Sequence, residues 1–217
     1  VSAIVPIGLE LGAGARISAT QRIFALGAMN QTSNPLDLAI TGQGFFAVQN
    51  PTVIPKEIFY TRAGNFTLSP DQSKPGYSNI STGSGFYVLD KNDQPLSVPT
   101  DASTIMIGSD GMTSVYRGGD TSNPVPVGQI AVWTFSNPAG LAGASDGQYA
   151  ITQASGSRIG GVAQSGSSGA ILQSYVEQSN VNVAEELVSL IAAQRSYEIT
   201  AKSVTASDQM LQKLGQM

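Results

Sequence analysis

Residues 182–214 read NVAEELVSLIAAQRSYEITAKSVTASDQMLQKL, and this stretch decides the fold that the sequence predicts. Neither Gly nor Pro occurs between residues 170 and 214, although both are frequent elsewhere in the chain. A run of good helix formers without a helix breaker predicts one long helix. Asn182 is a suitable N-cap residue, and Glu185 three positions later can return the hydrogen bond as in a capping box. At about 1.5 Å per residue this helix is roughly 48 Å long, so it must pack against something besides its own domain.

The apolar residues of this helix form two stripes on opposite sides. The first stripe alternates spacings of three and four residues, as in a heptad repeat, with two polar interruptions. Its members are Leu187, Leu190, Gln194, Tyr197, Ala201, Val204, Asp208 and Leu211. The second stripe consists of Val188, Ala192, Ile199, Ala206 and Met210. A helix with two opposed apolar stripes needs neighbours on both sides, and we predict that these side chains, with Ile191, pack between subunits. A helix buried inside its own two-layer domain is the alternative that periodicity leaves open.

The composition argues against several classes of function. Charged residues make up 12% of the chain and the formal net charge is −4, so nothing indicates a nucleic acid or an acidic lipid surface as partner. The sequence contains no Cys and no His, which removes thiolate chemistry, the usual general base and the commonest metal ligand. No apolar run is long enough for a membrane span. We therefore expect no cofactor, no metal site and no membrane insertion.

The rest of the chain predicts a mainly β fold, in which a single irregular antiparallel β domain follows an extended N-terminal connector and precedes the long C-terminal helix. The expected boundaries are 1–30 for the connector, 31–169 for the β domain, 170–181 for a return strand and 182–217 for the helix. Strands are expected within 36–48, with a Gly-mediated turn at 42–44, and at 58–66, 85–89, 105–107, 113–116, 125–135 and 147–152. We interpret 69–84 as a polar connection and the Gly- and Ser-rich stretch 156–169 as a mobile loop or linker.

Several motifs imitate catalytic or binding sites, and we interpret each of them as structural. The calcium-loop spacing that begins at Asp90 has Pro95 in the place that requires Gly. The sequence Gly42-Gln43-Gly44 imitates a dinucleotide fingerprint, but a strand follows it where a helix is required. Asp110 and Asp120 belong to ordinary turn dipeptides. The sequence therefore predicts no catalytic residue and no enzyme.

Four blocks of the sequence resemble the signature of the bacterial flagellar rod and hook proteins. They read NPLDLAITGQGFF at 34–46, YTRAGNF at 60–66, GFYVL at 85–89 and EQSNVNVAEELV at 177–188, the last continued by AQRSYE at 193–198 and DQML at 208–211. The positions that carry the signature are Asn34, Leu36, Asp37, Ile40, Gly42, Gly44, Phe45, Phe46, Tyr60, Thr61, Arg62, Gly64, Phe66, Ser179, Asn180 and Val181.

The resemblance implies a structural subunit that self-assembles through its C-terminal polymerisation helix into a helical tube. It also implies export by the flagellar type III apparatus and a final position in the basal body, crossing the periplasm. The implied partners are further copies of the chain, neighbouring rod and hook proteins, and the ring proteins of the peptidoglycan and the outer membrane.

The likeness is strongest to members that form the distal rod, the drive shaft that transmits torque from motor to hook. The middle of the chain is too short for the large extra domain of hook proteins. A proximal rod or hook-type axial protein is one alternative, and a secreted β binding module that oligomerises through its helix is another.

Family members begin with a helix that pairs with the C-terminal helix in the inner tube of the polymer. The sequence starts at Val1, beyond that helix, and we interpret the chain as a processed or trimmed product. The two stripes of the C-terminal helix are then expected to be partly bare.

Overall fold

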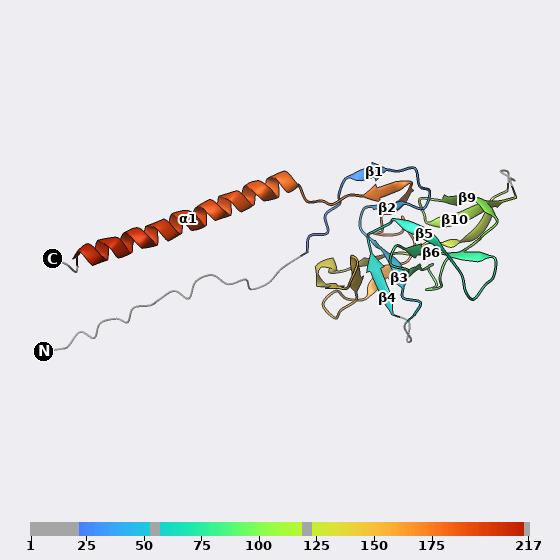
Figure 1. Cartoon of the computed structure of the whole chain (residues 1–217). Helices are drawn as coiled ribbons and strands as arrows, with labels where there is room; N and C mark the ends of the chain where they lie inside the picture. The colour runs from blue at the N-terminus through green and yellow to red at the C-terminus, as the bar shows by residue number, and fades with distance from the viewer. Residues whose placement is uncertain (1–21, 53–56, 119–122, 215–217) are drawn as a thin grey trace.

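A computed structural model describes residues 22–52, 57–118 and 123–214 of the 217-residue chain (Figure 1). It confirms the predicted fold class, because antiparallel β-sheets form the body of the protein and one long helix, α1 (Val183–Leu214), follows them. Figure 1 shows α1 projecting away from the sheets. Most of the expected connector, residues 1–21, lies outside the described residues. Within the described ranges, no helix combines the length and the apolarity needed to cross a membrane.

Within the described residues, the β domain is built from short strands arranged in four sheets. The strands are β1 (Met29–Gln31), β2 (Leu38–Thr41), β3 (Phe45–Gln49), β4 (Ile58–Thr61), β5 (Phe66–Pro70), β6 (Tyr77–Thr82), β7 (Tyr87–Val88), β8 (Ser97–Pro99), β9 (Ala102–Ile107), β10 (Met112–Arg117), β11 (Val125–Gln129), β12 (Val132–Phe135), β13 (Ala142–Gly143), β14 (Gln148–Ala150), β15 (Arg158–Gly160), β16 (Ala170–Gln173) and β17 (Tyr175–Glu177), with one short 3-10 helix, η1 (Pro138–Gly140). The largest sheet contains β3, β4, β5, β6 and β7 in its main path. Strand β10 pairs with β9 in the three-stranded sheet.

Strand β3 lies at the centre of the core, and all of its residues are buried. Because side chains alternate between the two faces of a strand, β3 contributes to two hydrophobic clusters. Phe46 enters the larger cluster, where its ring meets that of Phe66 edge to face at 5.2 Å. Phe45 enters the smaller cluster and packs in the same manner on Phe135 at 5.8 Å. The stretch 36–48 thus supplies residues to both clusters.

The Gly-mediated turn at 42–44 joins two different sheets and does not close a hairpin. Strand β2 pairs with β16, whereas β3 pairs with β4, β7 and β12. Gly42 and Gly44 have φ values of +128° and +144°, a region that side-chain-bearing residues rarely adopt. A Cβ atom at Gly44 would also lie 2.4 Å from Cγ1 of Val132. Glycine at these positions allows the chain to cross from one sheet to the other.

The interpretation of 69–84 as a polar connection is wrong, because the stretch contains β6, whose residues 78–81 are buried. The polar side chains are paired across strands. The Asn79 side-chain oxygen Oδ1 accepts a hydrogen bond of 2.6 Å from the Ser97 hydroxyl, and the hydroxyls of Ser81 and Thr67 lie 3.4 Å apart. Hydrogen bonding with these partners permits burial of polar residues that sequence patterning assigns to the surface.

The Gly- and Ser-rich stretch 156–169 is also more ordered than the sequence predicts. It contains β15, which pairs with β12, and both Ala163 and Ser168 within it are buried. The stretch therefore packs as part of the β domain instead of forming a linker.

The expected strands at 58–66 and 125–135 are each divided in two. The first is interrupted at Gly64, whose carbonyl oxygen accepts a hydrogen bond of 2.9 Å from the Leu38 backbone N–H. A Cβ atom at Gly64 would lie 1.6 Å from the Leu38 carbonyl oxygen, so only glycine allows this approach. The second is interrupted at Ile130 and Ala131, between β11 and β12.

We predict that Gly64→Ala destabilises the β domain by about 2–3 kcal/mol, because the backbone of β2 must move to admit the new methyl group. The measurement is urea unfolding followed by the fluorescence of Trp133. Gly83→Ala is the matched control, since a Cβ atom there meets no atom within 4 Å. Equal unfolding midpoints for the two variants would contradict the proposed reason for glycine at position 64.

Candidate functional site

The two segments that leave the β domain lie side by side, and we call this region the neck (residues 22–31 and 175–182). Within the neck, β1 and β17 form an antiparallel pair in which Met29 lies opposite Glu177. The pairing continues beyond the strands, since the Gln178 N–H donates to the Ala28 carbonyl at 2.8 Å. Figure 1 shows the neck between the sheets and α1. Both connections of the β domain therefore pass through one two-stranded structure.

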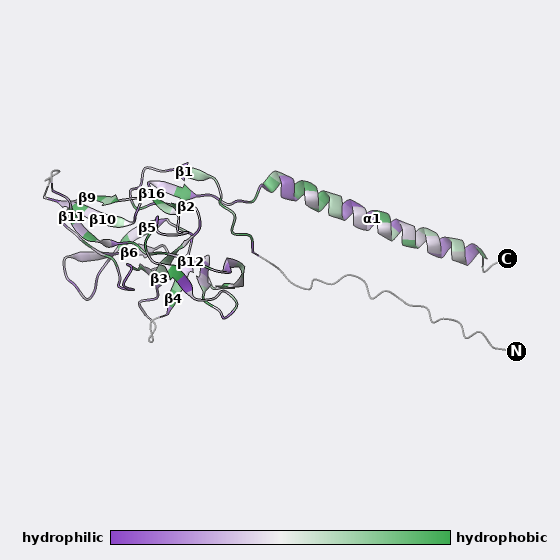
Figure 2. Cartoon of the chain, turned by 180° about the vertical axis from the view of Figure 1, so that it is seen from behind, coloured by the Kyte–Doolittle hydropathy of each residue, from purple (hydrophilic) through white to green (hydrophobic). Residues whose placement is uncertain are grey.

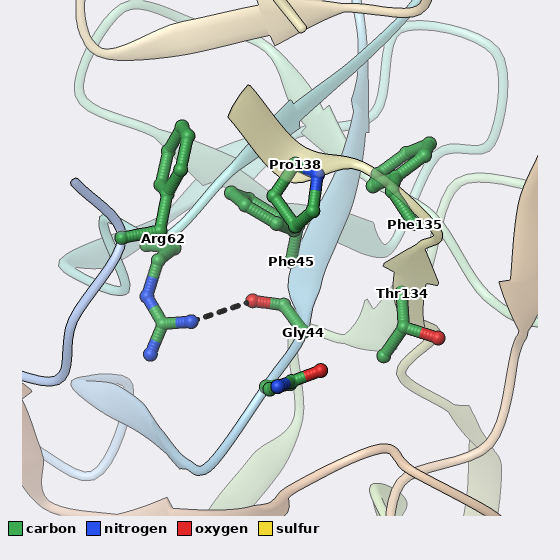
Figure 3. A pocket seen from close by; sticks show the side chains of 8 residues that line it. Gly44, Phe45, Arg62, Thr134, Phe135 and Pro138 are labelled. Atoms are coloured by element: carbon green, nitrogen blue, oxygen red, sulfur yellow. Dashed lines mark hydrogen bonds between the residues drawn. The ribbon is translucent and has the colours of Figure 1, made fainter. Parts of the chain in front are cut away.

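A partly buried ion pair fixes the neck to the β domain. The Arg62 Nε atom lies 2.9 Å from Oε2 of Glu177, and the two side chains are only 15% and 12% exposed. The Arg62 guanidinium also donates to the Gly44 carbonyl oxygen at 3.1 Å (Figure 3) and to the Gly42 carbonyl oxygen at 3.2 Å. The second Glu177 oxygen accepts from the Gly27 N–H at 3.1 Å. These bonds satisfy both charged groups and join β4, the 42–44 turn, β17 and the N-terminal connector.

Aromatic packing holds the connector against the smaller hydrophobic cluster. The Phe24 ring meets those of Phe45 at 5.4 Å and Tyr149 at 5.3 Å, both edge to face. Beside these rings, Arg62 and Pro138 line a cavity of about 80 Å³ (Figure 3). This cavity is too small for an ordinary organic ligand, whose sites occupy roughly 300–1,000 Å³. The arrangement therefore serves to attach the connector.

The structure brings several signature residues together beneath the neck. The Asn34 side-chain amide donates to the Asp37 carboxylate at 2.9 Å, and the Asp37 carbonyl accepts from the Tyr175 N–H at 3.2 Å. The buried members of the signature are Ile40, Gly44, Phe45, Phe46, Tyr60, Thr61, Gly64 and Phe66, and Leu36 packs half-buried against the larger cluster. Burial raises the pKa of the Tyr60 hydroxyl, although the nearby Arg158 acts in the opposite direction.

The last signature residues form hydrogen bonds just before α1 begins. The Asn180 side-chain amide donates to the Ala25 carbonyl at 3.1 Å, and the Ser179 hydroxyl accepts from the Val181 N–H at 3.2 Å. Asn182 caps the helix as predicted, because its side-chain oxygen accepts from the Ala184 N–H at 3.1 Å. Among the described residues, the Glu185 carboxylate accepts no hydrogen bond from the Asn182 N–H, so only the Asn182 half of the capping box is present.

Helix α1 is exposed to solvent on all sides. Its polar and apolar side chains alike are exposed wherever they are described, with Leu190 at 53% in the first stripe and Ile199 at 65% in the second. Figure 2 shows apolar residues along the length of the helix and no other element over it. The Leu211 side chain lies outside the described ones. The packing role of the two stripes therefore stays a prediction.

Hydroxyl side chains on α1 bond to its own backbone. Ser196, Thr200 and Ser203 each donate to the carbonyl oxygen four residues earlier at 2.9 Å, and Thr205 does so at 3.2 Å. These donors are satisfied within the helix. The helix can therefore enter an apolar environment without leaving them unpaired.

Sequence reasoning missed the partners of the neck. In the sequence, Glu177 belongs only to a terminal signature block, although a charged Arg62 among aromatic strand residues favours a carboxylate partner nearby. It also missed Gln173, whose amide donates at 2.9 Å to the carbonyls of Pro35 and Ile105 and accepts from the Ile107 N–H at 3.1 Å. No local pattern marks such an amide, because its partners are distant in sequence.

Asp90 and Asp110 lie in ordinary turns, and Asp120 lies outside the described residues. The Asp90 carboxylate accepts from the backbone N–H groups of Asn92 at 2.8 Å and Gln94 at 2.9 Å, which agrees with a turn at the calcium-like spacing. In the part of the chain that the structure describes, no group of three or more His, Cys, Asp or Glu residues could hold a metal ion.

Two family models match most of the described part of the chain. Residues 39–115 match the family described as flagellar hook protein FlgE/F/G D1 domain, and residues 172–217 match flagellar basal body rod FlgEFG protein C-terminal. The flagellar basal-body rod protein FlgG of Buchnera aphidicola subsp. Acyrthosiphon pisum is 43% identical over 213 residues, which cover 98% of this chain and 76% of that protein.

Two further relatives carry the same name. FlgG of Agrobacterium fabrum is 36% identical over 208 residues, which cover 96% of this chain and 74% of that protein. FlgG of Bacillus subtilis is 33% identical over 207 residues, which cover 94% of this chain and 74% of that protein. Identity at this level over nearly the whole chain shows that the protein belongs to the FlgG family of flagellar basal-body rod proteins, the structural subunits of the distal rod.

Proposed function

We propose that copies of this protein assemble by packing α1 between neighbouring subunits, and that the resulting helical tube transmits torque from the motor to the hook. The observation that carries the proposal is a 32-residue helix whose apolar side chains are exposed on opposite sides. Burying a Leu or Ile side chain contributes about 1.5–3 kcal/mol, so several such contacts favour association. Two different faces allow head-to-tail contacts, which generate open helical assemblies.

The neck is the part of the subunit that passes force between the helices and the β domain. Torque applied to the β domain reaches α1 through the paired strands β1 and β17 and through the Arg62–Glu177 ion pair. The two connections share backbone hydrogen bonds, so they move together. We propose that this coupling keeps the angle between helix and β domain constant in the assembled rod.

Membership of the family places the protein in the flagellar basal body, where the rod adjoins other rod proteins and the hook. We further propose that it is exported by the flagellar type III apparatus and that it crosses the periplasm. Contacts with the peptidoglycan-ring and outer-membrane-ring proteins belong to the same proposal. The proposed role is structural and requires no enzymatic activity.

We predict that Leu190→Glu in the first stripe and Ile199→Glu in the second each raise the concentration needed for assembly at least tenfold. The reason is that a buried carboxylate replaces an apolar contact, and tenfold corresponds to only about 1.4 kcal/mol. The measurement is light scattering over a concentration series, with negative-stain images of the same samples.

Thr200→Glu is the matched control, because it adds the same charge to α1 between the two stripes. If this control weakens assembly as much as Ile199→Glu, the stripes are not the contact surface. A monodisperse small oligomer of the unaltered chain would favour the oligomerising binding module, and a monomer at every concentration would show that α1 alone does not drive assembly.

We predict that Arg62→Met destabilises the β domain by about 3 kcal/mol, because the Glu177 carboxylate then remains partly buried without its cation. Amide hydrogen exchange should accelerate at Gly27 and Gln178 in the neck and stay unchanged along α1. Urea unfolding gives the free energy, and exchange followed by mass spectrometry gives the location.

Arg117→Met is the control for this prediction. Arg117 lies 3.7 Å from Asp101 in an exposed ion pair, whose loss should change the free energy of unfolding by no more than about 0.5 kcal/mol. Adding Glu177→Leu to Arg62→Met should restore part of the stability, since no charge then stays buried. A double variant less stable than the single one would argue against the ion pair as the cause.

A further inference from the structure

A polar groove runs along β8, and the neck contacts do not use it. It consists of two adjoining hollows of about 470 and 540 Å³, which share Lys74, Pro95 and Ser97 in their walls. The first hollow is lined by residues of β3, β6 and β7, and the second extends toward β11. Each hollow is within the size range of small-molecule sites. Because the two hollows adjoin, together they can hold an elongated ligand made of several linked units.

Two buried amide side chains open into the first hollow. Gln49 is 5% exposed and Asn79 is 2% exposed, yet both line the groove. Among the described residues, none bonds to the Gln49 side-chain amide. The Asn79 oxygen accepts from Ser97 at 2.6 Å, while no described residue accepts from its two N–H donors. Neither side chain is among the described buried polar groups that lack a partner, and both line the hollow, where their amides can bond to water or to a ligand that replaces it.

The groove is poorly suited to an added peptide strand. Its central strand β8 has only three residues, ends at Pro99 and follows closely after Pro95. The facing strand β11 carries Pro126. Proline has no N–H to donate and is typical of edges that resist strand pairing. Recognition in this groove must therefore come from side chains.

The chemistry of those side chains indicates the ligand. Lys74 and Asp71 bring opposite charges, and the other polar groups of the first hollow are amides and hydroxyls, with the ring of Tyr87 among them. Amide groups, which both donate and accept, pair well with hydroxyl and acetamido groups. We propose that the groove binds a neutral, N-acetylated oligosaccharide.

The wall that carries Gln94 is held rigidly. Arg158 forms a two-pronged ion pair with Asp93, with N–O distances of 2.7 and 2.5 Å, and lies over the Trp133 ring at 4.2 Å. The bond to Asp93 raises the pKa of Arg158, which stays charged. The Asp90 carboxylate fixes the Gln94 backbone at 2.9 Å. A wall fixed before binding reduces the entropy that a ligand must lose.

The test is saturation-transfer NMR of the full chain with a β-1,4-linked N-acetylglucosamine tetrasaccharide. We expect transfer to the acetamido methyl groups. Gln49→Met, which removes the amide but keeps the length of the side chain, should weaken binding about tenfold. Gln94→Ala at the exposed wall should weaken it about threefold, and this variant tests the site if Gln49→Met fails to fold.

Gln153→Met is the matched control, because Gln153 is exposed and lies outside the groove. Binding is expected to be unchanged in this control. The proposal is overturned if no saturation transfer to the tetrasaccharide is observed, because the groove then binds only water. It is also overturned if the Gln94→Ala and Gln153→Met variants bind the tetrasaccharide equally well. Equal binding of maltotetraose would refute the preference for acetamido groups, and displacement of the sugar by an extended peptide would assign the groove to peptides.

This inference is independent of the rod function proposed above. Gln49→Met leaves α1 and the neck untouched, so its assembly by light scattering should equal that of the unaltered chain. Loss of sugar binding with normal assembly would separate the two activities, whereas loss of assembly in this variant would show that the groove is a contact between subunits and would overturn the proposed site.

Discussion

The ion pair between Arg62 and Glu177 is the contact on which the arrangement of the chain depends. Two charges that are largely removed from water lose hydration, and they persist only where hydrogen bonds replace it. Here the replacements come from the carbonyl oxygens of the 42–44 turn and from the Gly27 N–H. The ion pair therefore requires the glycine turn, β17 and the N-terminal connector to be in place together, which links the position of α1 to the core of the β domain.

The sequence predicted best those features that short-range patterns determine. The start of α1 follows from an uninterrupted run of helix formers after Asn182, and the structure begins the helix at Val183; the expected end at residue 217 lies outside the described residues. Strand β6 was missed because its polar residues are buried by partners on β5 and β8, which lie elsewhere in the sequence. The 42–44 turn was found as a turn, but its role in changing sheets depends on pairing between β2 and β16.

The residues of the candidate site also fall into two groups, those that the sequence predicted and those that only the structure shows. The signature located Arg62, the glycine turn and the residues before α1, because resemblance depends on residue identity. It did not show that these positions converge on Glu177, and it gave no indication of the amides of Gln49 and Asn79 in the groove. Convergence of residues far apart in the chain depends on strand register, which short sequence patterns specify weakly.

The antiparallel pairing of β1 with β17 makes the mechanical strength of the subunit dependent on direction. A force that pulls one connector along its length while the other is held loads all three residue pairs at once, in shear. A force that spreads the connectors first breaks the bond from Asn180 to the Ala25 carbonyl and then opens the strand pairs one after another from Met29 and Glu177. The subunit is therefore stiff under axial load and yields first when its two connectors are spread apart.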